Sequence, residues 1–148
     1  MAGSYLTDPL AVASAALFDY AEAVDEARID DFVALFTADA LFYRKDVIGH
    51  DAVRRLTLEM LDNYTATSHH ISNIRATMTG DDIEARSYVY AWHQTVEGAQ
   101  VEVWGRYRSV LCLEDGVWRF SRHTARSAGV RPPGALGPTA SVPRHPLD

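Results

Sequence analysis

The sequence has little cysteine, little lysine and no long apolar run. Cys112 is the only cysteine, so an internal disulfide is excluded, and no Cys/His spacing typical of a zinc site is present. No stretch approaches the roughly 20 apolar residues that span a bilayer, and the amino terminus lacks the basic start and apolar run of a secretory signal. We therefore expect a cytoplasmic protein without a membrane partner or a metal site, stabilised by packing.

Positive charge is also scarce. The 14 Lys and Arg residues are outnumbered by 20 Asp and Glu residues, which gives a formal net charge of −6. Apart from the neighbouring pairs Arg44–Lys45 and Arg54–Arg55 the basic residues are scattered singly, and the overall charge repels phosphate backbones, so nucleic acid is not an expected partner. What the chain does have is 47% hydrophobic residues in a length of 148, enough for one domain with a sizeable core.

The first half of the sequence predicts three helices and one short strand. Asp8 followed by Pro9 is a favourable helix start, and an apolar stripe at spacings of three and four continues to about Ala27 (Leu10, Ala13, Leu17, Tyr20, Val24). A second short helix is expected over residues 30–36, and residues 41–44 are typical of a strand. A third helix is expected to open at 49–51, with an inner face of Val53, Leu56, Met60 and Leu61.

From Thr67 the apolar period changes to two, which predicts four long antiparallel strands joined by turns at 80–82, 97–98 and 114–116. Helices followed by such a meander indicate an α+β domain whose curved sheet wraps over its helices and leaves an interior. The body is expected to span residues 1–128. Residues 129–148 hold five of the six prolines and are predicted to form an irregular Pro/Gly-rich arm.

Because successive side chains of a strand point to opposite faces of a sheet, the sequence predicts which residues share a face. Val89, Ala91 and His93 share one face, and Gly105 and Tyr107 share the matching face of the next strand. The small residues leave room beside His93, which indicates a pocket for a small molecule. The opposite faces carry more aromatic residues than a solvated sheet needs (Tyr88, Tyr90, Trp92, Trp104), so we expect a homo-oligomer formed through the outer face.

Four polar positions are candidates for chemistry in that pocket. An inward His93 is suited to act as a general base if a carboxylate fixes its tautomer, and Asp25 is the candidate carboxylate. The alternatives are a core histidine with a local hydrogen bond and a helix-end aspartate in water. Only one of His69 and His70 can face inward in a given register, and Tyr43 would ordinarily be a half-buried packing residue.

These positions fall in the order of a known family. The segments 20–25, 41–44, 68–73, 91–93, 105–108 and 115–118 resemble the SnoaL-like branch of the nuclear transport factor 2-like superfamily, and within it the scytalone dehydratase-like proteins. The resemblance covers roughly residues 10–125. It implies a cone-shaped α+β barrel, with three helices packed against a curved sheet around a pocket, and no metal or organic cofactor.

The resemblance also implies roles for individual residues. Asp25 matches an aspartate that hydrogen-bonds a catalytic histidine, matched by His93. Tyr43 matches a tyrosine that, with a second one, holds a water against the substrate carbonyl. His69 matches the other catalytic histidine; a shift of one residue would select His70 instead, and we prefer His69.

The sequence departs from the family pattern at three pocket positions. The second water-holding tyrosine falls on Val24, and two polar residues that contact the dehydratase substrate fall on Gly105 and Tyr107. The base pair is kept while the groups that activate the carbonyl are reduced, so scytalone itself is a poor match as substrate. The substrate-binding residues expected from the faces and the resemblance are Val24, His70, Val89, Ala91, Gly105 and Tyr107.

Together these features predict a cofactor-independent lyase or cyclase acting on an oxygenated, largely apolar cyclic ketone or polyketide-derived phenol. In this hypothesis His93, oriented by Asp25, removes a proton next to the carbonyl, while Tyr43 and His69 stabilise the enolate or protonate the departing hydroxyl. One alternative is an isomerase in which Asp25 itself carries the proton. The other is a non-catalytic ligand-binding domain or structural subunit of the same fold.

Overall fold

The computed structural model describes residues 7–134 and 140–141. Helices α1 (Pro9–Asp25) and α2 (Ile29–Ala34) come first, followed by strand β1 (Phe36–Phe42) and helix α3 (His50–Leu61). Four long strands follow, and a short strand is the last element described: β2 (Tyr64–Thr79), β3 (Asp82–Thr95), β4 (Gln100–Glu114), β5 (Val117–Arg131) and β6 (Ala140–Ser141).

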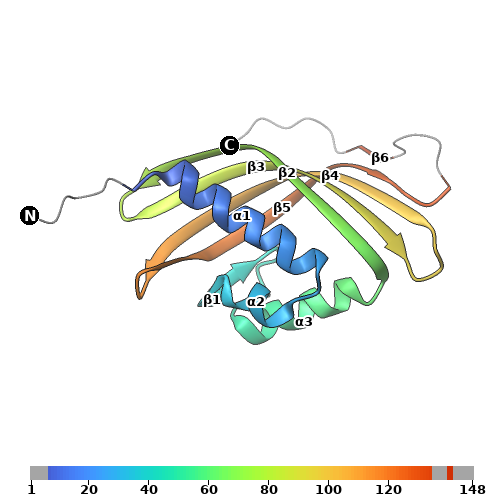
Figure 1. Ribbon diagram of the computed structural model, residues 1–148, viewed down its shortest axis with the longest axis horizontal. Helices are drawn as coiled ribbons and strands as arrows, with labels where there is room; N and C mark the ends of the chain where they lie inside the picture. The colour runs from blue at the N-terminus through green and yellow to red at the C-terminus, as the bar shows by residue number, and fades with distance from the viewer. Residues whose placement is uncertain (1–6, 135–139, 142–148) are drawn as a thin grey trace, which may run out of the picture.

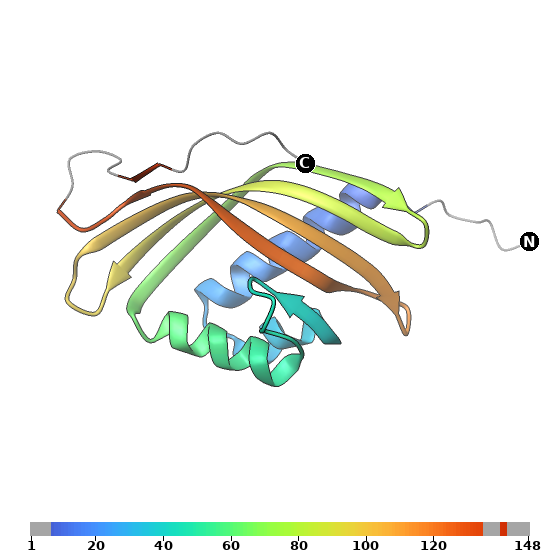
Figure 2. The same ribbon diagram turned by 180° about the vertical axis from the view of Figure 1, so that it is seen from behind.

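The strands form one curved, unclosed sheet in the order β1-β5-β4-β3-β2, with β6 paired to β5. β1 runs parallel to β5, and the long strands pair antiparallel with their chain neighbours. The three helices gather under one face of this sheet, which curves over them (Figures 1 and 2). The predicted α+β fold is therefore confirmed.

The helix starts follow from capping. Oδ1 of Asp8 accepts the backbone N–H groups of Leu10 at 3.0 Å and Ala11 at 3.3 Å, and Pro9 occupies the first helical position of α1. The helix ends at Asp25, two residues before the predicted end, because Ala27 adopts a left-handed conformation with φ of 52°.

The predicted boundary between the second helix and the following strand is wrong. The helix expected over 30–36 is α2, which ends at Ala34, and the strand expected over 41–44 is β1, which begins at Phe36 and ends at Phe42. The backbone N–H of Phe120 on β5 donates to the carbonyl of Leu35 at 2.8 Å, and β1 pairs with β5 from Phe36 onward. This pairing joins segments more than 80 residues apart, so local periodicity does not reveal it.

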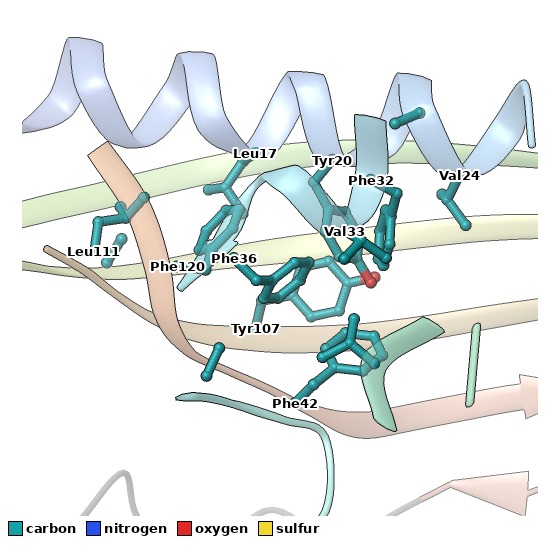
Figure 3. Packing of buried hydrophobic residues seen from close by; sticks show 14 of the residues in the cluster. Leu17, Tyr20, Val24, Phe32, Val33, Phe36, Phe42, Tyr107, Leu111 and Phe120 are labelled. Atoms are coloured by element: carbon teal, nitrogen blue, oxygen red, sulfur yellow. The ribbon is translucent and has the colours of Figure 1, made fainter. Parts of the chain in front are cut away.

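The core lies between α1, α2 and the concave face of the sheet (Figure 3). Its centre is aromatic: the ring of Phe120 has its centroid 5.4 Å from that of Phe36 and 6.2 Å from that of Tyr20. Leu17 and Leu111 are also fully buried there. Rings that pack from α1, β1 and β5 join the helices to the sheet, and they form the base on which the candidate site rests.

Truncating Phe120 to alanine is expected to lower the free energy of unfolding by about 3–5 kcal/mol, because it removes a fully buried ring and leaves a cavity. Urea denaturation followed by circular dichroism measures this change. Val117→Ala, at an exposed position of the same strand, is the matched control and should cost less than about 1 kcal/mol. A Phe120→Ala loss as small as that of the control would contradict this assignment of the core.

Two sequence predictions concern the C-terminal part of the chain. β5 runs on to Arg131, past the predicted end of the body at residue 128. Of the predicted arm 129–148, residues 135–139 and 142–148 lie outside the described residues.

In the described part of the chain, no helix has both the length and the apolar character needed to cross a membrane. The homo-oligomer through the outer sheet face stays a prediction.

Candidate active site

A cavity of about 340 Å³ opens between the helices and the concave face of β2 to β5. Its volume falls within the range typical of small-molecule sites. Val24 of α1 and Tyr107 of β4 contribute to its wall, as do the predicted residues Val89, Ala91 and Gly105. His69 of β2, His93 of β3 and Tyr43, in the bend that follows β1, also line this space, so the three residues converge on one chamber.

Asp25, the last residue of α1, is held by three hydrogen bonds from β2. The backbone N–H of His69 donates to Oδ2 at 2.8 Å, and ring atom Nδ1 of His69 lies 2.6 Å from Oδ1. The hydroxyl of Thr67 donates to Oδ1 at 2.8 Å. A carboxylate at a helix C-terminus faces the negative end of the helix dipole, and these donors offset that repulsion.

The hydrogen bonds decide the charge of Asp25. Burial raises its pKa, but the bonds from the ring and backbone of His69 and from Thr67 outweigh burial and hold the pKa below its ordinary value. Asp25 is therefore ionised at neutral pH and acts only as an acceptor, which places the ring proton of His69 on Nδ1. Nε2 of His69 then carries the lone pair of a base that Asp25 orients.

The prediction that Asp25 hydrogen-bonds His93 is wrong, because His69 occupies that position. His93 lies opposite Thr67 in the β2–β3 register, with its ring edge-on to that of His69 at a centroid distance of 5.5 Å. Burial, followed by the neighbouring His69, lowers the pKa of His93, so this ring is neutral at neutral pH. Nδ1 of His93 is buried, and within the described residues it has no hydrogen-bond partner.

The structure also contradicts the placement of His70 among the substrate-binding residues. His70 is exposed, its Nε2 lies 3.0 Å from Oγ of Ser68, and its ring packs beside that of Tyr90. Because neighbouring strand residues point to opposite faces, His69 enters the cavity and His70 lies on the outer face of the sheet. The preference for His69 over His70 as the inward residue agrees with this geometry.

Three tyrosine hydroxyl groups meet at the inner part of the cavity. The Tyr20 and Tyr43 hydroxyl oxygens are 2.6 Å apart, and Tyr107 interacts with both groups. Burial is the largest cause that raises the pKa of each of the three phenols. All three therefore keep their protons at neutral pH. In the Tyr20–Tyr43 pair one hydroxyl donates to the other, so the proton of the accepting hydroxyl is the one left to donate to a bound oxygen.

Tyr43 reaches this cluster through an unusual backbone. Its φ of 59° lies in the left-handed region that large side chains rarely adopt, and its N–H donates to the carbonyl of His123 at 2.8 Å. Such conformations persist where the surrounding structure enforces them, and they gather at functional sites.

Sequence reasoning missed Tyr20, whose only signal was a hydroxyl within an apolar helical stripe.

His123 closes the cluster from behind. It is fully buried, its Nδ1 lies 2.9 Å from Oγ of Ser109, and its ring centroid is 4.6 Å from Tyr20 and 4.5 Å from Tyr107. Burial lowers its pKa to about 3, so His123 is neutral and packs like an aromatic residue. The tyrosines are thus held by rings on their far side and face the cavity with their hydroxyl groups.

Gly105 leaves space in the cavity because it has no side chain. A Cβ atom at this position would lie 3.1 Å from the carbonyl oxygen of Arg126 and 3.1 Å from Cγ1 of Val89. Both distances are tighter than ordinary contacts, and the Arg126 carbonyl belongs to the neighbouring strand backbone, which cannot easily yield.

Within the described residues, no three His, Cys, Asp or Glu side chains come together as metal ligands.

Solved structures share this fold across almost the whole chain. A provisionally named scytalone dehydratase from Novosphingobium aromaticivorans DSM 12444 has a TM-score of 0.78 at 24% identity, covering 91% of this chain and 93% of its own. A provisionally named aromatic ring hydroxylase from the same species has a TM-score of 0.74 at 26% identity, covering 80% and 88%. The comparison with curated protein sequences gave no match.

A third similar structure is a hexachlorocyclohexane dehydrochlorinase, LinA-type3, from Novosphingobium barchaimii LL02. Its TM-score is 0.71 at 19% identity, and the alignment covers 93% of this chain and 94% of that one. At such identities the likeness shows the fold. The sequence profile of the SnoaL-like domain matches residues 5–124, a span that contains Asp25, both inward histidines and the three tyrosines. The chain therefore belongs to the SnoaL-like domain family, as the resemblance to the nuclear transport factor 2-like superfamily implied.

Proposed function

We propose that this protein is a cofactor-independent lyase of the dehydratase type, or a related cyclase, acting on an oxygenated cyclic or polyketide-derived small molecule. The observation that carries the proposal is the presence of an oriented base, Asp25 with His69, and three protonated phenols in one cavity. Two of the similar folds, the scytalone dehydratase and the dehydrochlorinase, bear names of enzymes that eliminate a small molecule, which supports the reaction class.

The proposed mechanism begins with proton removal. Nε2 of His69 takes a proton from the carbon next to the substrate carbonyl, and the electrons of that C–H bond move to the carbonyl oxygen as an enolate. Asp25 stabilises the positive charge that forms on His69. General-base catalysis of this kind raises the reaction rate by about 10²–10⁴-fold. The Tyr43 hydroxyl, supported by its hydrogen bond with Tyr20, donates a hydrogen bond to the enolate oxygen between largely apolar walls.

Loss of the hydroxyl completes the elimination. The enolate electrons return to form a carbon–carbon double bond, the C–O bond to the β-hydroxyl breaks, and the hydroxyl leaves as water with the proton carried by His69. The enzyme is then regenerated with neutral His69 and protonated tyrosines. Every step is a proton transfer or a bond cleavage within the substrate, for which these side chains are sufficient. His93 is proposed to contact the substrate without acting as the oriented base.

An isomerase in which Asp25 itself shuttles the proton is less compatible with the geometry. All three hydrogen bonds to Asp25 stabilise its ionised form and make it a weaker base. An isomerase based on His69 would use the same site, but the enolate would be reprotonated before the hydroxyl departs. The products of one reaction therefore separate elimination from isomerisation, and an inert cavity would indicate the ligand-binding alternative.

The test uses 3-hydroxy-1-tetralone, a bicyclic β-hydroxy ketone whose dehydration and tautomerisation give 1-naphthol. The 148-residue chain is expected to accelerate 1-naphthol formation, followed by absorbance, over the rate in buffer by at least about 10³-fold. The comparison compound 1-tetralone lacks the hydroxyl and should only exchange its α-protons for deuterium. Deuterium exchange without dehydration of the hydroxy ketone would support the isomerase. If the protein accelerates neither exchange nor dehydration, catalysis of this type is contradicted.

A further inference from the structure

A second hollow, of about 540 Å³, lies on the face of the sheet opposite to the helices. Its side chains alternate with buried ones such as Ala85, which point toward the core. Its cationic lining is one exposed arginine from each of the four long strands: Arg75, Arg86, Arg108 and Arg122. We call this hollow the arginine groove; no step of the proposed reaction uses it.

The strand register brings these arginines side by side. Arg75 of β2 lies opposite Arg86 of β3, and Arg86 lies opposite Arg108 of β4. Arg122 of β5 is opposite Val110, two residues further along β4. Adjacent strands are about 4.8 Å apart, so the four arginines cross a width of roughly 14 Å. Like charges directly opposite each other on a sheet are destabilising, and this fold carries two such pairs in succession.

The concentration of positive charge contrasts with the rest of the chain. The net charge is −6, yet Glu84 is the one carboxylate-bearing residue that lines the groove. A face-to-face contact between two copies at this place would bring positive charge against positive charge.

We propose that the arginine groove binds a small molecule that carries at least two phosphate groups. A guanidinium group presents a planar fork of N–H donors that matches a phosphate, and it remains charged at all physiological pH values. Guanidinium groups on neighbouring strands are close enough to share one phosphate, and the width of the row leaves room for a second.

Isothermal titration calorimetry of the 148-residue chain with sodium tripolyphosphate tests this proposal. Tripolyphosphate is expected to bind at least about tenfold more tightly than orthophosphate, because it engages several arginines at once. The double variant Arg75→Gln/Arg86→Gln should weaken binding about tenfold or more. The matched control Arg54→Gln/Arg55→Gln removes the same charge from helix α3 and should retain binding within about twofold.

Three outcomes would overturn the proposal. The first is equal affinity for tripolyphosphate and orthophosphate, and the second is an equal loss of binding in the groove variant and the α3 control, which would indicate only a general charge effect. The third is a ligand-free dimer, seen by size-exclusion chromatography, that dissociates in the Arg75→Gln/Arg86→Gln variant, since the groove would then be a contact between copies. Circular dichroism and 1-naphthol formation confirm that each variant is folded.

Discussion

Replacement of His69 by glutamine is expected to lower kcat/KM for the dehydration of 3-hydroxy-1-tetralone by about 10³-fold. Glutamine has a similar reach and can still place a polar group near Asp25, but it has no basic nitrogen to accept the substrate proton. The loss should appear mainly in kcat, because proton transfer occurs in the transition state and not in substrate binding. Initial rates of 1-naphthol formation at saturating and limiting substrate separate the two constants.

The partner variant Asp25→Asn is expected to lower kcat/KM by a similar factor, about 10²–10³. An amide can donate to Nδ1 of His69, which would move the ring proton to Nε2 and remove the lone pair from the cavity side. Asp25→Asn combined with His69→Gln should therefore be no worse than His69→Gln alone, because the two residues act as one unit.

The pH dependence of stability gives a readout independent of substrate. The pKa of Asp25 is lower in the folded protein than its ordinary value of about 3.9, so the charged carboxylate stabilises the fold above that pH. This contribution is lost as the pH falls through the folded pKa. The difference in unfolding free energy between the wild type and Asp25→Asn should accordingly shrink as urea titrations are moved from neutral pH to below about pH 4.

Two histidines serve as controls for the oriented base. His70→Gln, one residue away but on the outer face, should leave kcat/KM within about twofold. His93→Gln should lower it by no more than about tenfold, since His93 lines the cavity without the carboxylate that orients His69. A collapse of activity in His93→Gln together with normal activity in His69→Gln would reverse the two roles and restore the assignment first drawn from the sequence.

The sequence placed both histidines correctly on the inner face but paired Asp25 with His93, whereas its partner in the structure is His69. Strand alternation is local, and it predicts which side of a sheet His69 and His93 occupy. The partner of Asp25 depends on where the end of α1 rests on the sheet, and this contact joins residues more than 40 positions apart. In the structure α1 packs over β2, which brings Thr67 and His69 to Asp25 while His93 lies one strand further in.

The tyrosine cluster illustrates the same limit. Tyr20 belonged to a helical stripe, Tyr43 to a short strand and Tyr107 to an inward face, so each was visible only as part of a local pattern. Their hydroxyl groups meet because α1 crosses the sheet there and because β1 pairs in parallel with β5, and neither feature leaves a periodic signal. The left-handed backbone of Tyr43 was equally hidden, since tyrosine is not a residue that predicts positive φ.

The second large effect is expected from Tyr43→Phe, which should lower kcat for the dehydration by about 10²-fold with little change in KM. The ring keeps its stacking on Phe42, at a centroid distance of 4.1 Å, so only the hydroxyl is lost. That loss removes one donor to the enolate and leaves the Tyr20 hydroxyl without its 2.6 Å partner. Because the enolate charge develops only during the reaction, the variant should bind substrate almost normally.

Tyr88→Phe is the matched control for this prediction. Tyr88 is exposed on the outer face, where its ring lies under the guanidinium group of Arg106, so loss of its hydroxyl should leave kcat within about twofold. Tyr20→Phe should fall between the two, since its hydroxyl orients that of Tyr43. An unchanged kcat in Tyr43→Phe would contradict a role for the tyrosine cluster in stabilising the enolate, and it would leave the Asp25–His69 pair as the sole source of catalysis in this cavity.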